Sequence, residues 1–330
     1  MEITAQSRDA LRRIDFPPVD LDLMIEGQEG ITWPLWIAIA EACERHGIGT
    51  LFRSDHYLNL DGFAERGSLD ALATLAALAA VTTTLRLGTL VSPATFRHPS
   101  ELAKLATTVD HVSDGRFELG LGAGWFEPEH LAYGFDYHDL RKRVELLAEQ
   151  LEIVHGNWAP GPFSFSGQHY RLTGLDAQPK PVQQPHPPLI MGGRAGPKVS
   201  ALAARFADEY NSEFASPAEI AARKARIDAA CERAGREPMP FSLMAVLIVG
   251  DDEADVRARV RRAAAFWGLD DAALQRELEN GWVVGTIEQV AEQLRALQPV
   301  GVSRVMCQTV PPDDLEFVEI LGRVLTPLVG

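Results

Sequence analysis

Short apolar runs alternate with stretches of helical period along most of the chain. Runs with the length and composition of single strands occur at residues 21–25, 50–53, 85–91, 116–121, 188–191, 207–211, 241–249 and 303–308. Between these runs, apolar residues recur three and four positions apart, as at Leu102, Leu105, Ala106 and Val109. The pattern therefore predicts eight strands that alternate with helices.

Capping and turn residues mark the ends of the predicted helices. The first helix is expected over residues 33–46, with Thr32 as its N-cap, Pro34 in its first turn and Gly47 after its end. Further helices are expected over 68–81, from Pro99 to the stop at Asp114-Gly115, and over 139–155, 197–206, 216–235, 252–297 (in pieces) and 313–325. A long loop is expected over 125–138, and a small hairpin is expected around Ser166-Gly167.

The order of these elements predicts the fold. Residues 85–125 read as strand, helix and strand, which is the parallel βαβ unit. Eight strands in one series favour a (β/α)8 TIM barrel over a doubly wound sheet. Because no composition break divides the chain, we expect one domain over 1–330, with a leader over 1–18 and an insertion region over about 157–188. An insertion of this size is unusual unless it covers a site or makes an interface.

Composition limits the partners and the location. The 330 residues include 31 basic and 46 acidic side chains, so the formal net charge of −15 argues against nucleic acid or an anionic membrane as the main partner. The longest apolar run, around 71–81, is too short to span a bilayer, and the N-terminus lacks an apolar secretion signal. We therefore expect a soluble cytoplasmic protein. The scattered Cys43, Cys231 and Cys307 favour buried thiols over a disulfide or a metal site.

Functional residues of a TIM barrel gather at the carboxyl ends of its strands. Asp55 and His56 follow the second predicted strand, and an imidazole titrates near neutral pH and can pass a proton at a redox centre. The alternative for His56 is a structural role in capping the loop. Asp55 orients the imidazole, binds a polar edge of a cofactor, or serves only as a turn residue.

Two glycine turns follow other strands. Gly120-Leu-Gly122-Ala-Gly124 lacks the third glycine of a dinucleotide fingerprint because Trp125 stands there, so it is either a phosphate cradle or a place of close backbone packing. The turn 192–196 is the better anion site, since free amides, a helix N-terminus and Lys198 converge there.

The remaining polar residues give weaker indications of chemistry. Glu127 and Glu129 are candidate acid–base groups, although a solvated loop face is the default interpretation for both. The chain contains no GxSxG, HExxH or CxxC motif, which removes the serine-hydrolase, zincin and thiol-redox classes and leaves no metal site. Four histidines are interpreted as structural: His98, His111, His130 and His138.

Several motifs together resemble a known family. Ser54-Asp55-His56, the run LGTLVSP at 87–93, the segment 94–130 and Met191-Gly192-Gly193 resemble the bacterial luciferase-like superfamily, and more narrowly its branch of oxidoreductases that use the deazaflavin coenzyme F420. The resemblance extends over about 21–325. It implies a TIM barrel with an insertion region, a flavin-type ring in the barrel mouth, a homodimer, and a non-prolyl cis peptide at Leu90–Val91 that forms a bulge behind the ring.

The resemblance also implies residue roles. Asp55 and His56 would lie at the deazaflavin, with His56 as proton donor or as the group that stabilises the reduced ring. Gly192 and Gly193, with the helix start at Pro197 and Lys198, would hold the cofactor phosphate. The remaining cofactor bed would be formed by Thr89, Leu90, Val91, Ser92, Gly122, Ala123 and Gly124.

One departure from the family pattern concerns the substrate. Sugar-phosphate dehydrogenases of this branch carry a catalytic glutamate directly after the glycines of strand four, where this chain has Trp125. We therefore do not assign that acid or that substrate here. Trp125 and Glu127 are instead expected to line the substrate pocket, which the loops 57–67, 125–138 and 157–188 would shape.

These expectations predict an oxidoreductase that transfers a hydride between C5 of F420 and a small organic substrate. The first alternative is a monooxygenase on the same fold that uses reduced FMN and oxygen. A path of basic residues near Lys198, Arg194 or Arg53 would favour F420, because its polyglutamate tail is acidic. The second alternative is a non-catalytic flavin-binding protein, which would tolerate His56→Ala.

Overall fold

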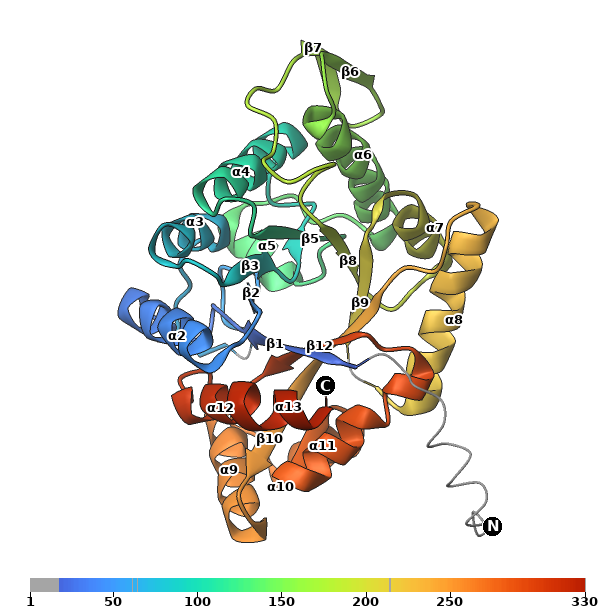
Figure 1. The fold of residues 1–330 in the computed structure, drawn as a ribbon. Coiled ribbons are helices and arrows are strands. Elements are labelled where there is room, and N and C mark those ends of the chain that lie inside the picture. The colour runs from blue at the N-terminus through green and yellow to red at the C-terminus, as the bar shows by residue number, and fades with distance from the viewer. Residues whose placement is uncertain (1–17, 61, 64, 214, 330) are drawn as a thin grey trace.

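The computed structural model of the chain describes residues 18–329 except 61, 64 and 214, and Figure 1 shows helices surrounding a central group of strands. Eight parallel strands pair in a closed ring, because β10 pairs with both β9 and β12. The ring consists of β1 (Asp20–Ile25), β2 (Thr50–Arg53), β3 (Arg86–Thr89), β5 (Phe117–Gly122), β8 (Leu189–Gly192), β9 (Glu209–Glu213), β10 (Phe241–Gly250) and β12 (Arg304–Gln308). The predicted TIM barrel is confirmed. Apart from Pro18, the expected leader lies outside the described residues.

Most of the helices cover the outside of this ring (Figure 1). The helices of the described residues are α2 (Trp33–His46), α3 (Ala71–Val81), α4 (Pro99–Val112), α5 (Glu127–Tyr133), α6 (Leu140–Trp158), α7 (Pro197–Phe206), α8 (Pro217–Arg233), α9 (Glu253–Trp267), α10 (Asp271–Asn280), α11 (Ile287–Arg295), α12 (Leu315–Ile320) and α13 (Thr326–Val329), with a 3₁₀ turn at Gln298–Val300 and a π turn at Leu321–Leu325. Helix α5 lies within the outline of the ring in this view (Figure 1). The bounds of α2 and α7 coincide with the predicted ones. Thr32 is indeed the N-cap residue of α2, and Gly47 ends that helix in the left-handed conformation.

The long loop expected over 125–138 contains a helix, so that expectation is wrong. Helix α5 has Pro128 in its first turn, acidic residues at its start and Gly134 as a left-handed C-cap. Each of these is a helix-end signal. The seven-residue helix carries too few apolar positions for its period to stand out in the sequence.

The region 252–297, expected to be helical in pieces, also contains a strand. Strand β11 (Trp282–Thr286) pairs in parallel with the second half of β10, over Val246 to Gly250. The ten-residue β10 extends past its pairing with β9 and β12, and β11 satisfies the backbone groups of that extension.

The insertion region carries the expected hairpin. Strands β6 (Phe163–Ser166) and β7 (Arg171–Leu175) pair antiparallel around the predicted turn. The Glu149 carboxylate on α6 accepts hydrogen bonds from the backbone N–H groups of Gln168 (2.6 Å), His169 (3.0 Å) and Tyr170 (3.0 Å). One carboxylate therefore anchors the hairpin turn to the barrel's helical layer.

The barrel interior is layered. Near the amino ends of the strands it holds the charged residues Asp22, Glu118, Glu209 and Arg304. Above them lies a buried apolar cluster of Met24, Phe52, Leu90, Ile190 and Met306. A larger apolar core fills the space between strands and helices. The carboxyl ends of the strands, above the apolar cluster, form the mouth.

Candidate functional site

The floor of the mouth is formed by a bulge after β3. The strand expected over 85–91 stops at Thr89, the Leu90–Val91 peptide is cis as the resemblance implies, and the two-residue β4 (Ser92–Pro93) then pairs with β5. Val91 and Met244 pack on the apolar cluster but are only half-buried, whereas the cluster itself is buried. Apolar surface is therefore accessible at the mouth.

Two glycines make room for this bulge. A Cβ atom at Gly122 would lie 2.7 Å from a methyl group of Val91, and one at Gly192 would lie 3.2 Å from the other methyl. Of the two interpretations of the strand-four glycines, the structure supports close packing at Gly122.

His56 lies just beyond the end of β2 and is held by Glu129. Its Nδ1 is 2.7 Å from Oε1 of Glu129, and the Tyr57 backbone N–H donates to Oε2 of the same carboxylate (3.0 Å). The imidazole stands edge-on to Trp125 and Phe126, with ring centroids 5.7 and 6.0 Å away. The side chain of His56 is 15% exposed. Apart from the Glu129 contact, no hydrogen bond of the described residues reaches the ring, so Nε2 is left for a ligand.

The surroundings of His56 favour its charged form. Burial lowers its pKa, but the hydrogen bond and charge of Glu129, assisted by the charges of Glu26 and Asp55, outweigh burial and raise the pKa above the ordinary value. An imidazolium at this position can donate a proton or stabilise negative charge.

Glu129 was missed as a site residue, because a solvated face was the default interpretation for it. The Glu129 side chain is only 1% exposed, whereas Glu127 is exposed. A recognised helix start at Glu127-Pro128 would have placed the two residues on different sides of α5. For Glu127 the solvated face is confirmed, and its expected place in the substrate pocket remains a prediction. Trp125 is 60% exposed beside His56.

Asp55 is engaged elsewhere. Its carboxylate accepts hydrogen bonds from Ser92 Oγ (2.6 Å) and from Arg97 (2.5 Å). Arg97 also donates to Tyr57 Oη (3.0 Å) and Asp70 (2.7 Å). Burial lowers the pKa of Arg97, but the nearby carboxylates of Asp55 and Asp70 outweigh burial and raise it. The group that contacts the imidazole is therefore Glu129, and Asp55 joins the ends of β2 and β4. The implied contact of Asp55 with a cofactor stays a prediction.

The turn after β8 has the features of an anion site. Gly193 and Ala195 adopt positive φ, and the Ala195 N–H donates to Tyr210 Oη (2.9 Å). Helix α7 then starts at Pro197 without a side-chain cap, and Lys198 is exposed in its first turn. Uncapped first-turn amides beside a lysine suit a phosphate.

Two of the three basic residues considered for an acidic tail remain accessible. Arg53 is fully buried and donates to the carbonyls of Ser54 (3.0 Å) and Leu69 (2.9 Å), so it is not available. Arg194 pairs with Glu213 at 2.6 Å but is 78% exposed, and such surface pairs exchange partners at little cost. Arg194, within the turn, and Lys198, just after it, are therefore the accessible cations at this site.

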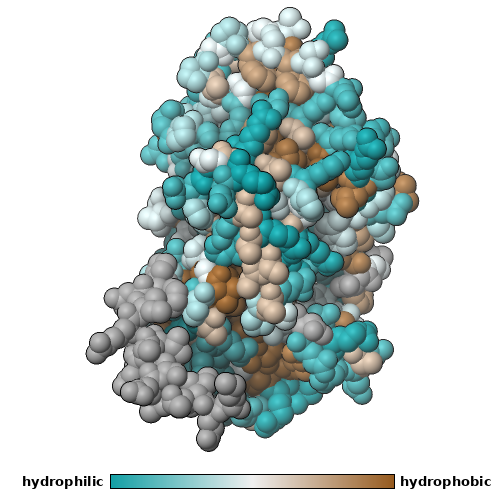
Figure 2. Space-filling view, turned by 90° about the vertical axis from the view of Figure 1, so that its right-hand side faces the viewer, coloured by the Kyte–Doolittle hydropathy of each residue, from teal (hydrophilic) through white to brown (hydrophobic). Residues whose placement is uncertain are grey.

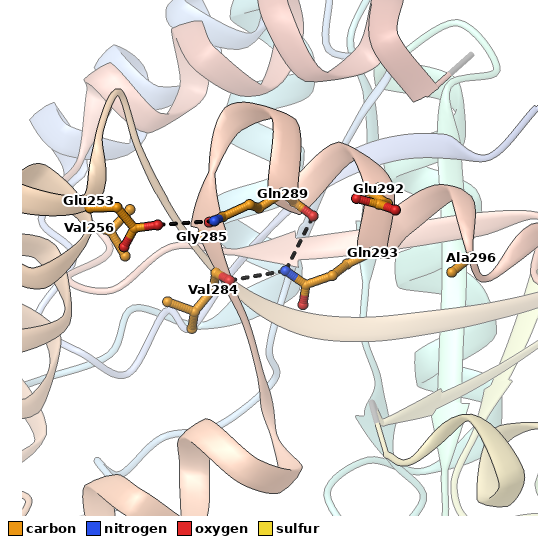
Figure 3. Close-up of a pocket in the computed structure, with 8 residues that line it drawn as sticks. All are labelled: Glu253, Val256, Val284, Gly285, Gln289, Glu292, Gln293 and Ala296. Carbon is orange, nitrogen blue, oxygen red and sulfur yellow. Dashed lines mark hydrogen bonds between the residues drawn. The ribbon is translucent and has the colours of Figure 1, made fainter. Parts of the chain in front are cut away.

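A shallow pocket of about 660 Å³ lies apart from these residues. Figure 3 shows it between α9, β11 and α11, all of which belong to the segment between β10 and β12. Two of its glutamines are bonded to other lining residues: Gln289 Nε2 donates to Glu253 (3.0 Å) and Gln293 Nε2 to the carbonyl of Val284 (3.0 Å). We place the functional site at the mouth because the perturbed imidazole and the anion turn lie there.

The described residues form neither a metal-binding cluster nor a membrane-spanning helix. Within the described part of the chain, no group of three or more His, Cys, Asp or Glu side chains is arranged to hold a metal ion. No helix among the described residues is both long and apolar enough to cross a bilayer. Figure 2 shows a largely hydrophilic face with separate hydrophobic patches.

Comparison with known proteins identifies the class. Residues 22–304 match the family described as luciferase-like monooxygenase. The chain belongs to this family, so the resemblance to the luciferase-like superfamily is confirmed, whereas the narrower resemblance to its F420 branch stays a prediction. It is a luciferase-like oxidoreductase.

Individual relatives differ in cofactor. The pyrimidine monooxygenase RutA of Stutzerimonas stutzeri (strain A1501) is 28% identical over 332 residues, covering 90% of this chain and 89% of the relative. An FMNH(2)-dependent dimethylsulfone monooxygenase of Pseudomonas putida is 26% identical over 299 residues, covering 81% and 80%. A solved F420-dependent secondary alcohol dehydrogenase, in complex with an F420-acetone adduct, matches with a TM-score of 0.79 at 18% identity over 95% of this chain and 99% of that chain. At this identity the structural match shows the fold alone.

Proposed function

We propose that the chain is an oxidoreductase that holds a flavin-type ring in the barrel mouth, and that coenzyme F420 is its cofactor. The observation that carries the proposal is His56, a half-buried imidazole with a raised pKa and a free Nε2, at the same mouth as accessible apolar surface. The Asp-His pair is the motif by which the chain resembles the F420 branch.

The residues present fit such a cofactor. Val91 and Met244 offer an apolar floor, and the turn 192–196 with Lys198 offers amides and a positive charge for a phosphate. When bound, the cofactor supplies the hydride chemistry. The protein's part is to orient the ring on Val91, to hold the phosphate at the start of α7, and to keep a proton on His56 at the ring edge.

A second candidate is a monooxygenase that uses reduced FMN and oxygen. It is favoured by the two curated relatives, one of which is named as FMNH(2)-dependent. The same floor, phosphate turn and imidazole serve either ring, so the difference lies in the tail. Arg194 and Lys198 are the residues that an acidic tail would contact.

Binding and turnover of the purified full chain test these candidates. The protein is titrated with F420 and with reduced FMN, and bound cofactor is followed by its absorbance. Turnover is then measured on a panel that includes secondary alcohols, uracil and dimethyl sulfone. The proposal expects tighter binding of F420, weakened by Arg194→Gln with Lys198→Gln, and reduction or oxidation of F420 by a panel member. Tight binding of reduced FMN with oxygen-dependent turnover supports the second candidate, and binding without turnover under both conditions supports a non-catalytic protein.

A further inference from the structure

We infer that Glu129 is a positioning residue that acts through His56, fixing which imidazole nitrogen faces the mouth and keeping that imidazole protonated. The inference rests on the proposed function, because it concerns the group that this function places at the ring edge. The hydrogen bonds of Glu129 go to the His56 ring and to the Tyr57 backbone N–H, so an effect of Glu129 on the mouth passes through one of these two groups.

The carboxylate of Glu129 is held on both oxygens. Oε1 accepts from His56 Nδ1 at 2.7 Å and Oε2 accepts from the Tyr57 backbone N–H at 3.0 Å. These two donors lie 73 and 72 residues earlier in the chain, in the loop that follows β2. A buried carboxylate with both oxygens engaged has no freedom to rotate away from the ring.

This contact determines the roles of the two ring nitrogens. A carboxylate only accepts hydrogen bonds, so Nδ1 carries a proton in both the neutral and the charged imidazole. Nε2 is then the nitrogen that gains or loses the second proton. Trp125 and Phe126 contact the ring edge-on at interplanar angles of 78° and 85°, and they limit its rotation.

The charges that face His56 come from three elements. Glu129 lies on α5, Glu26 follows β1, and Asp55 precedes His56 in its own loop. Arg97 is paired with Asp55, which reduces the effect of that carboxylate on the ring. Glu129 is therefore the main anion at His56, and it supplies a carboxylate four residues after Trp125, which stands at the position of the family glutamate.

The primary experiment measures His56 in the full chain without cofactor. The pKa of His56 is followed by NMR titration in the wild type, in Glu129→Gln and in Glu101→Gln. Glu101 is the matched control because it is likewise the third residue of a helix with Pro in its first turn, but it is exposed. We expect Glu129→Gln to lower the His56 pKa by about 1 unit or more, and Glu101→Gln to leave it unchanged. An unchanged His56 pKa in Glu129→Gln overturns the inference.

A mutant cycle separates positioning from a purely structural role. With cofactor bound, Glu129→Gln should lower kcat with little change in KM, and should move the alkaline limit of the pH profile down by the same shift as the pKa. In a His56→Gln background, Glu129→Gln should have no further effect on kcat. Equal losses in both backgrounds would show that Glu129 acts by holding the Tyr57 backbone, which contradicts the inference. If the NMR shift is found but no flavin-type cofactor binds, the proposed function fails and the positioning of His56 stands.

Discussion

The two ends of the barrel interior both contain charged groups, but they use them differently. At the amino end, Arg304 contacts Asp22 (2.5 Å), Glu118 (3.0 Å) and Glu209 (3.2 Å), and it also donates to Thr50 Oγ1 (2.9 Å). At the mouth, His56 contacts one carboxylate and retains a free nitrogen. The amino end is closed by ion pairs among strands, whereas the mouth keeps polar atoms available.

The two ends differ in which elements carry their charged groups. Each carboxylate at the amino end lies on a barrel strand, so the partners are positioned by the strand pairing itself. His56 and Glu129 lie in a loop and a short helix after the strands, where geometry can change without opening the barrel. Loss of a residue should therefore reduce stability at one end and activity at the other.

The largest effect is expected for Arg304→Met. Three buried carboxylates would lose their shared cation, and the free energy of unfolding should fall by about 3–5 kcal/mol. The pKa values of Asp22 and Glu209 are already raised by burial against the attraction of Arg304, and they rise further without it. An acid whose pKa is higher in the folded than in the unfolded protein disfavours folding while it is ionised, and this cost disappears when it is protonated. The variant should therefore regain stability as the pH falls from 8 to 5.

Urea unfolding at both pH values checks this prediction, with Arg141→Met as the control. Arg141 forms an exposed pair with Glu145, so its loss should leave stability nearly unchanged. An equal loss in the two variants would contradict the structural role of the amino-end cluster.

A large effect on activity alone is expected for His56→Gln. Glutamine keeps a donor for Glu129 but cannot carry a proton to the cofactor, so kcat/KM should fall about 100-fold, or about 2.7 kcal/mol in the barrier. The unfolding free energy should change by less than about 1 kcal/mol, in contrast to Arg304→Met. Steady-state kinetics and urea unfolding on the same preparations measure both quantities. Full activity of the variant would instead support a structural role of His56 in capping the loop.

An intermediate effect is expected for Gly122→Ala. The added methyl group would push Val91 toward the mouth, lowering stability by about 1–3 kcal/mol and weakening cofactor binding. Gly67→Ala is the control, since a Cβ there meets nothing within 4 Å. Thermal unfolding and cofactor titration measure the two effects, and normal cofactor affinity in Gly122→Ala would show that Val91 does not form the floor of the binding site.

The smallest effect is expected for Glu44→Gln on the outer surface near the start of β3. Glu44 accepts from the backbone N–H groups of Thr83 (2.7 Å), Thr84 (2.6 Å) and Leu85 (3.1 Å), and these bonds outweigh desolvation and lower its pKa to about 2. Because the pKa of Glu44 is lower in the folded than in the unfolded protein, the ionised carboxylate stabilises the fold above the unfolded value of 4.5. This stabilisation is lost as the pH falls toward 2. The variant should lose less than about 1 kcal/mol at pH 7 because solvent screens this half-buried surface carboxylate. Acid titration of stability should show a shallower fall in the variant than in the wild type.

Local signals in the sequence are sufficient to predict the barrel. Strand runs such as 50–53 and helix ends such as Gly47 are local signals, because a strand's apolar run and a helix's cap are set by residues within one turn of each other. The motifs that include Asp55-His56 are also sufficient to predict the family. These features need no knowledge of which segments meet in space.

The carboxylate that holds the imidazole is set by the tertiary structure. Asp55 adjoins His56 in sequence, yet the fold turns it toward Arg97, and Glu129 comes from a helix that follows two further barrel strands, β3 and β5. In the same way, β11 forms because β10 extends beyond its barrel partners. Such contacts join residues more than 30 positions apart, and no local pattern encodes them because their geometry exists only once the strands have closed.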